Sequence, residues 1–88
     1  MSIPLPYDDN DDRIPELGSS FGEVLRRHRR MVKLTQEELA LETGLDRTFV
    51  SLMERGLRRP SLATVFIIAR RFGVKASQLV VELEERLP

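Results

Sequence analysis

The fold is decided by residues 35–55, which read TQEELALETGLDRTFVSLMER. Thr35 and Glu38 have the spacing of a capping box, in which the threonine hydroxyl accepts a hydrogen bond from a backbone amide and the glutamate reaches back. Gly44 suits the left-handed conformation that ends a helix, and Asp46 is a good N-cap for the next one. The stretch therefore predicts two short helices joined by a tight turn that lets them cross steeply.

Three more helices are expected around this pair. One should begin near Ser20 and stop near Lys33, with apolar residues and His28 on its inward face. Another should run from a cap at Ser61 to Gly73, and a last one should carry an apolar stripe to the C-terminal end. The inward residues expected between Ser61 and Gly73 are Leu62, Val65, Phe66, Ala69 and Phe72.

Charge divides the chain into two parts, although its formal net charge is zero. Residues 1–18 hold five acids and one base, a balance of −4, and show no apolar periodicity, so a flexible acidic arm is expected. Residues 19–75 hold twelve bases and six acids, a balance of +6, which favours a polyanionic partner. With 88 residues and no strand pattern, the sequence predicts one compact, five-helix, all-α domain over residues 19–88.

Several function classes are not supported by the composition. The absence of cysteine excludes a disulfide framework and a thiolate metal site. The apolar run 65–69 is far shorter than a membrane span, and no secretory signal is visible, so a cytoplasmic location without membrane contact is expected. One histidine and no glycine-rich phosphate loop leave no catalytic set, so neither enzyme activity, nor a cofactor, nor a metal is expected. His28 is expected to be a packed or half-buried residue.

The second helix of the central pair should point a polar face outward. Major-groove reading needs donors and acceptors near the start of a protruding helix. Arg47 can hold guanine O6 and N7 in a fork, and Thr48 and Ser51 can donate or accept. The outward residues expected to meet double-stranded DNA are Arg47, Thr48, Ser51, Leu52 and Arg55.

These features together resemble the lambda-repressor-like, or Xre-like, helix-turn-helix family over residues 20–80. A narrower likeness, to the controller proteins of restriction-modification systems, lies in LDRTFVS at 45–51. The family resemblance rests on LTQEELA at 34–40, GL at 44–45, SLMERG at 51–56, RPSLAT at 59–64, Ala69, and FGV at 72–74.

The resemblance implies roles for residues around the outward helix. Gln36, at the start of the first helix of the pair, would contact a phosphate and a base near it, and Thr35 beside it would also belong to the DNA-binding residues. Arg29 would pair with Glu54, fixing one helix against another, and Arg58 and Arg59 would hold the DNA backbone. Leu52 departs from the family pattern, which often has a polar residue there, and this leaves Arg47 as the main candidate for base reading.

The resemblance also implies sequence-specific DNA binding, expected here as repression or autoregulation of transcription. A homodimer on a palindromic operator is expected because one short helix reads few bases, and half-sites should lie about 10 base pairs apart. The alternative is an antitoxin or another protein-interaction module with secondary DNA binding, whose partner would engage the N-terminal arm or the C-terminal helix. The residues expected at a dimer interface are Ile67, Val80, Leu83 and Leu87.

Overall fold

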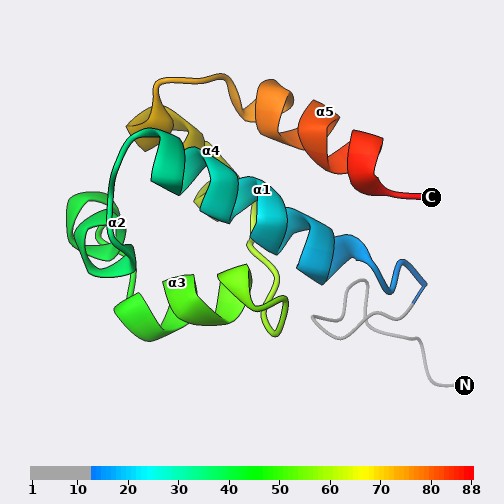
Figure 1. Ribbon diagram of the computed structural model, residues 1–88, viewed down its shortest axis with the longest axis horizontal. Coiled ribbons are helices and arrows are strands. Elements are labelled where there is room, and N and C mark those ends of the chain that lie inside the picture. The colour runs from blue at the N-terminus through cyan, green and yellow to red at the C-terminus, as the bar shows by residue number, and fades with distance from the viewer. Residues whose placement is uncertain (1–12) are drawn as a thin grey trace, which may run out of the picture.

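The computed structural model describes residues 13–88, and the described part of the chain forms five α-helices and no strand (Figure 1). The predicted all-α, five-helix fold is confirmed. The expected acidic arm falls largely on residues 1–12, which lie outside the described residues. The helices are α1 (Leu17–Met31), α2 (Gln36–Thr43), α3 (Arg47–Glu54), α4 (Leu62–Phe72) and α5 (Ala76–Arg86).

The residues that begin and end α2 and begin α3 are those predicted from the sequence. The Thr35 hydroxyl accepts from the Glu38 amide at 3.0 Å, and the Glu38 carboxylate accepts from the Thr35 amide at 2.9 Å. Gly44 ends α2 in the left-handed region, with φ of 76°. Asp46 then caps α3 by accepting from the amides of Thr48 and Phe49. Local hydrogen bonds thus fix both helices and the short turn between them.

The first helix begins earlier than predicted, at Leu17 rather than near Ser20. Its N-cap residue, Glu16, makes no side-chain capping bond, so the true start has no local sequence signal. The end near Lys33 is close to the prediction. Lys33 adopts a left-handed φ of 59°, and the bonds around it turn the chain from α1 toward α2.

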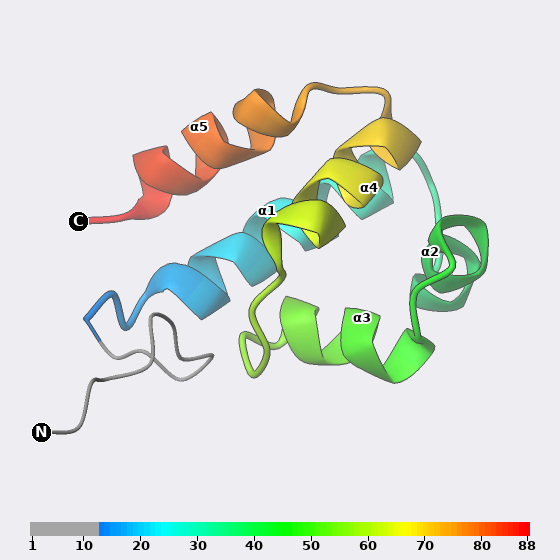
Figure 2. The same cartoon turned by 180° about the vertical axis from the view of Figure 1, so that it is seen from behind.

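The helices are arranged around α1, which crosses the middle of the molecule with α5 on one side and α3 on the other (Figure 1). Seen from behind, α4 lies across α1, and α2 closes the end where α1 stops (Figure 2). No helix among residues 13–88 is both long and apolar enough to cross a membrane. The core between these helices contains Phe21, Val24, Leu25, Leu39, Ala40, Val50, Met53, Val65, Ile68, Ala69, Phe72 and Leu79.

Two residues predicted to face inward on α4 do not. Leu62 is 72% exposed and Phe66 is 51% exposed, whereas the neighbouring Val65 and Ile68 are buried. The helix is apolar on more than one face, so a 3.6-residue period alone does not identify the buried stripe. The exposed residues leave an apolar surface on α4.

A close approach of two backbones places α1 against α3. A Cβ atom added at Gly22 would lie 2.6 Å from the Met53 carbonyl oxygen and 2.7 Å from that of Glu54. One turn earlier, a Cβ at Gly18 would lie 2.9 Å from the Gly56 carbonyl oxygen. Because these distances are too short for any other side chain, the two glycines bring the end of α3 against α1.

Candidate nucleic-acid interface

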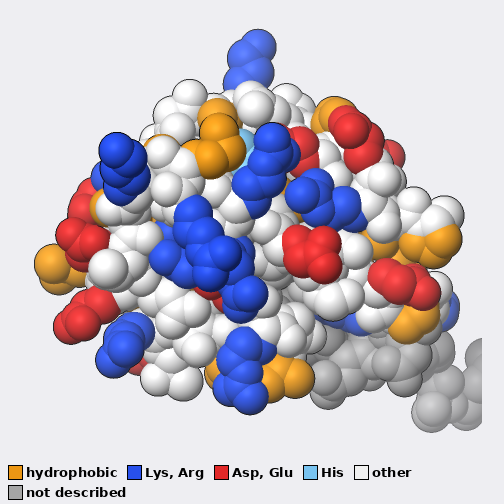
Figure 3. Space-filling view, viewed as in Figure 1, with side chains coloured by type: hydrophobic (Ala, Val, Ile, Leu, Met, Phe, Trp, Pro, Cys, Tyr) orange, Lys and Arg blue, Asp and Glu red, His pale blue; other side chains and the backbone are white. Residues whose placement is uncertain are grey.

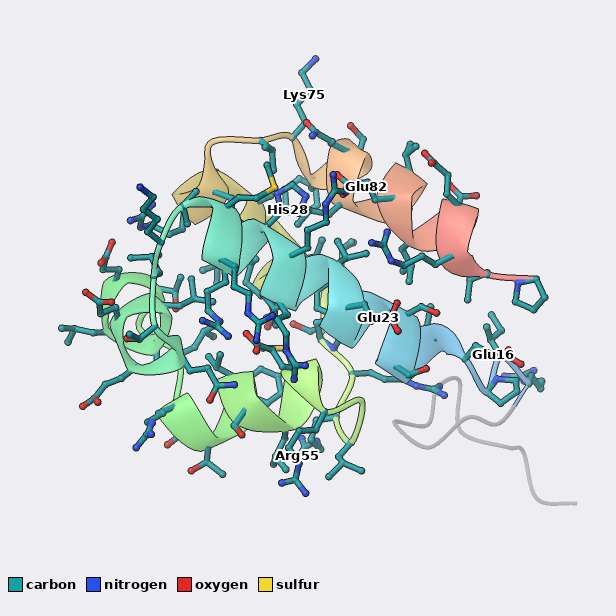
Figure 4. The ribbon with its side chains drawn as sticks, viewed as in Figure 1. Glu16, Glu23, His28, Arg55, Lys75 and Glu82 are labelled. Carbon is teal, nitrogen blue, oxygen red and sulfur yellow. The ribbon has the colours of Figure 1, made fainter. Side chains whose placement is uncertain are left out.

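The outward face of α3 carries the polar side chains predicted to read DNA. Arg47, Thr48 and Arg55 are exposed, and Ser51 and Leu52 are half-buried. Figure 4 shows Arg55 projecting from the end of α3 away from the rest of the molecule. On the opposite face, Val50 and Met53 are fully buried in the core. The helix therefore stands on apolar residues and presents donors and acceptors outward, which is what major-groove reading requires.

The last residue of α3, Glu54, has a buried carboxylate that connects this helix to α1 and α2. The Glu54 side chain is 0% exposed. Arg29 on α1 donates to it twice, from Nε to Oε2 at 2.6 Å and from Nη2 to Oε1 at 2.9 Å. Arg26 on α1 and Gln36 on α2 also donate to Oε1, at 3.3 Å and 3.1 Å. The Arg29 and Glu54 pair implied by the family resemblance is therefore part of a larger network.

The charge of this carboxylate is held by its donors. Burial by itself would raise the pKa of Glu54, but hydrogen bonds from Arg29, Gln36 and Arg26, with the positive charge of Arg29, keep that pKa below its ordinary value. The hydrogen bond to Glu54 and the negative charge of that carboxylate raise the pKa of Arg29, although burial by itself would lower it. Glu54 is therefore ionised at neutral pH, and it fixes α1, α2 and α3 relative to one another.

The start of α2 lies beside this network. Gln36 is half-buried and commits one amide N–H to Glu54, which leaves its carbonyl oxygen and its second N–H for other partners. Thr35 is exposed and uses its hydroxyl oxygen as the cap acceptor, so its O–H is still able to donate. Both predicted residues thus have hydrogen-bonding capacity at the N-terminus of a helix, where phosphates bind well.

The two arginines after α3 are placed differently. Arg58 is exposed, and its guanidinium carbon lies 5.7 Å from the centre of the Phe49 ring, which holds it beside α3. Arg59 is half-buried and donates to the Ile14 carbonyl oxygen at 3.2 Å, next to an apolar pocket that includes Leu17 and Leu62. The geometry therefore brings Arg58 to the α3 face, whereas Arg59 fastens the segment before α1.

The profile of the helix-turn-helix family matches residues 25–79, which include all of α2, α3 and α4 and the part of α1 that carries Arg26 and Arg29. The chain belongs to the helix-turn-helix family. The resemblance identified in residues 34–40 and 51–56 is thereby confirmed.

Relatives in the helix-turn-helix family carry regulatory names. A hypothetical transcription factor of Neisseria meningitidis serogroup B is 45% identical over 87 residues, covering 99% of this chain and 78% of the relative. An uncharacterised transcriptional regulator of Sinorhizobium fredii is 36% identical over 69 residues, which cover 78% of this chain and 84% of that regulator. The crystal structure of the restriction-modification controller protein C.AhdI from Aeromonas hydrophila aligns with a TM-score of 0.69 at 37% identity, covering 74% of this chain and 97% of that one.

Outside the helix-turn-helix pair, α4 and α5 expose the residues predicted for a dimer interface. Ile67 and Val80 are each 40% exposed, and Leu83 and Leu87 are half-buried. Exposed Phe66, which was predicted to be inward, lines a different pocket from Val80 and Leu83. Val80 and Leu83 line one apolar pocket with exposed Leu62 of α4, and exposed apolar side chains grouped in this way commonly mark a protein contact.

Sequence reasoning missed the partners of His28. The residue is buried, as predicted, and its ring stacks on Phe72 with 5.6 Å between centres. Its Nε2 lies 2.9 Å from Oε2 of Glu82 on α5, and Figure 4 shows the two side chains meeting between α1 and α5. Arg27 donates to the same carboxylate at 3.0 Å. Pairs so far apart in sequence, 54 residues for His28 and Glu82, leave no local signal.

Proposed function

We propose that this protein is a DNA-binding regulator of transcription that inserts α3 into a major groove. The observation that carries the proposal is the exposed polar face of a helix held rigidly from beneath by the Glu54 network. Arg47, in the first turn of α3, is the main candidate for base reading, with Thr48 and Ser51 beside it. Thr35, Gln36 and Arg58 would hold the backbone on either side of the groove.

In this proposal, the regulator binds a palindromic operator as a homodimer. It represses transcription, including transcription of its own gene. One α3 contacts only a few base pairs, so a second copy is needed for useful specificity. The exposed apolar residues of α4 and α5 supply a surface that a second copy could cover. The same surface would serve the alternative function, in which a different protein, such as a toxin, is the main partner. The mass of the purified protein in solution distinguishes a homodimer from a monomer that awaits such a partner.

The test of the proposed function is selection of duplexes from a random pool, together with DNA from upstream of the protein's own gene. The selected duplex is then titrated with the wild-type protein, Arg47→Ala and a control, Lys75→Ala. Lys75 is exposed and projects from the side of the molecule opposite α3 (Figure 4). Losing a bidentate contact with a base costs about 1–3 kcal/mol and relaxes the preference at that position.

The expected result is selective binding by the wild type, a loss of about 5- to 150-fold for Arg47→Ala, and little change for Lys75→Ala. Equal losses in the two variants would indicate a general effect of charge and would refute base reading by Arg47. If the wild type selects no duplex, the proposed function is wrong.

A further inference from the structure

A groove of about 510 Å³ runs along the outer face of α1, apart from the residues assigned above to the DNA contact. Figure 3 shows Lys and Arg side chains gathered over α1 and toward α3 on the same face of the molecule. Arg26, Arg27, Arg30 and Met31 line the groove together with Glu23 and Glu54. We call this feature the α1 groove.

The acids of the α1 groove pair with Arg26 alone among its arginines. Glu23 has a partner outside the groove, since Arg86 Nε lies 3.4 Å from its Oε2. Glu54 is bound twice by Arg29, which does not line the groove, and more weakly by Arg26 at 3.3 Å. Arg27 pairs with Glu82 of α5, outside the groove, at 3.0 Å. Arg30 is exposed and has no ion pair within residues 13–88. The groove therefore keeps an excess of positive charge.

The α1 groove also adjoins the start of α2. Arg26 Nε and Gln36 Nε2 both donate to the same oxygen, Glu54 Oε1, at 3.3 Å and 3.1 Å. A DNA strand held at Gln36 thus passes close to Arg26, whose side chain is 43% exposed. Arg30 lies one turn further along α1, about 6 Å in the axial direction. Nucleotides of one strand follow one another every 3.4 Å or so along the duplex, so consecutive phosphates can reach the two arginines.

We infer that the α1 groove binds backbone phosphates of the DNA that flanks the sequence read by α3. This inference rests on the proposed function and extends it, because it adds a second, sequence-independent contact from a helix outside the central pair. Arg30 supplies the main contact, and Arg26 supports it from within the Glu54 network. Such a contact adds affinity without changing which bases are preferred.

The experiment measures the salt dependence of binding to the selected duplex for the wild type, Arg30→Gln and the control Lys75→Gln. Each phosphate contact contributes about 0.9 to the slope of log affinity against log salt concentration. Arg30→Gln should lower that slope by about 0.9 per bound protomer, so its deficit relative to the wild type should be about 3.5-fold larger at 50 mM than at 200 mM salt for one bound protomer, and about 12-fold larger for the proposed homodimer. Lys75→Gln should leave the slope unchanged, and circular dichroism checks that all three proteins are folded.

Three outcomes decide between the possibilities. A reduced slope for Arg30→Gln with an unchanged base preference supports the α1 groove as a phosphate site. A slope equal to that of the wild type, while the wild type still selects DNA, overturns the inference and leaves the proposed function standing. If the wild type selects no duplex, the proposed function fails, and the inference that rests on it fails too.

Discussion

Replacing Glu54 by glutamine tests whether its buried carboxylate holds the DNA-reading helix in place. All the side chains that bind Glu54 are donors, from Arg26, Arg29 and Gln36. A glutamine amide has one oxygen and one NH₂ group, so its nitrogen must face a donor in either orientation. The less costly orientation puts the nitrogen at the Oε2 position, where only the 2.6 Å bond from Arg29 Nε is lost.

The size of the effect follows from the burial of both partners. The Glu54 side chain is 0% exposed and that of Arg29 is 11% exposed, so water cannot replace the lost interaction. A hydrogen bond to a charged group contributes about 1.5–3 kcal/mol, and breaking a buried ion pair costs about 3–5 kcal/mol. Since glutamine keeps the other bonds, we expect Glu54→Gln to lower the free energy of unfolding by about 2–4 kcal/mol.

Urea unfolding followed by circular dichroism at several pH values is the assay. The pKa of Glu54 is lowered in the folded protein, so its stabilising effect is complete above the unfolded pKa of about 4.3 and is lost as pH falls through the folded pKa. The difference between wild type and Glu54→Gln should therefore be constant near neutral pH and shrink in acid.

The matched control is Glu42→Gln, which removes a carboxylate paired with Arg71 at the surface of α2. Its side chain is 40% exposed, and exposed ion pairs contribute about 1 kcal/mol or less. A cost for Glu54→Gln no larger than that of Glu42→Gln, or a difference that does not change with pH, would refute the reasoning.

Two further predictions concern packing and assembly. Gly22→Ala should lower the free energy of unfolding by about 1–3 kcal/mol in urea, because the added Cβ would press on the Met53 and Glu54 carbonyls; the gain of about 1 kcal/mol usual for this change in an open helix would contradict the close approach. Val80→Asp should shift the proposed homodimer toward monomer in sedimentation velocity, whereas Val81→Asp, on another face of α5, should not; an unchanged mass for Val80→Asp would move the interface elsewhere.

Local signals explain what could be predicted from the sequence. The capping box at Thr35 and the cap at Asp46 use atoms within three residues of each other, so residue order alone specifies them. The outward face of α3 followed because Val50 and Met53 identify its buried side. Since the turn before Asp46 is short, these signals were enough to predict both the central pair and its exposed polar residues.

What could not be predicted depends on contacts between distant parts of the chain. Arg26 stands in an arginine-rich stretch of α1, and its bond to Glu54 spans 28 residues, so no local pattern indicates that partner. Arg59 follows Arg58 directly, yet one lies on the Phe49 ring and the other binds Ile14. Arg58 and Arg59 are adjacent in sequence, but the loop after α3 turns their side chains to different partners, and no local sequence pattern predicts this.

The Glu54 network is better understood through positioning than through stability. A buried ion pair replaced by apolar residues of similar volume is often as stable or more stable, so stability alone does not account for a carboxylate here. An apolar residue at 54 could not, however, orient the Gln36 amide or hold Arg29 and Arg26 beside it through hydrogen bonds. Because a single carboxylate binds α1 and α2 from the end of α3, it sets the residues proposed to contact the DNA backbone at a fixed distance from those proposed to read the bases. Specific recognition needs that fixed distance, since phosphate contacts determine the register in which the bases are read.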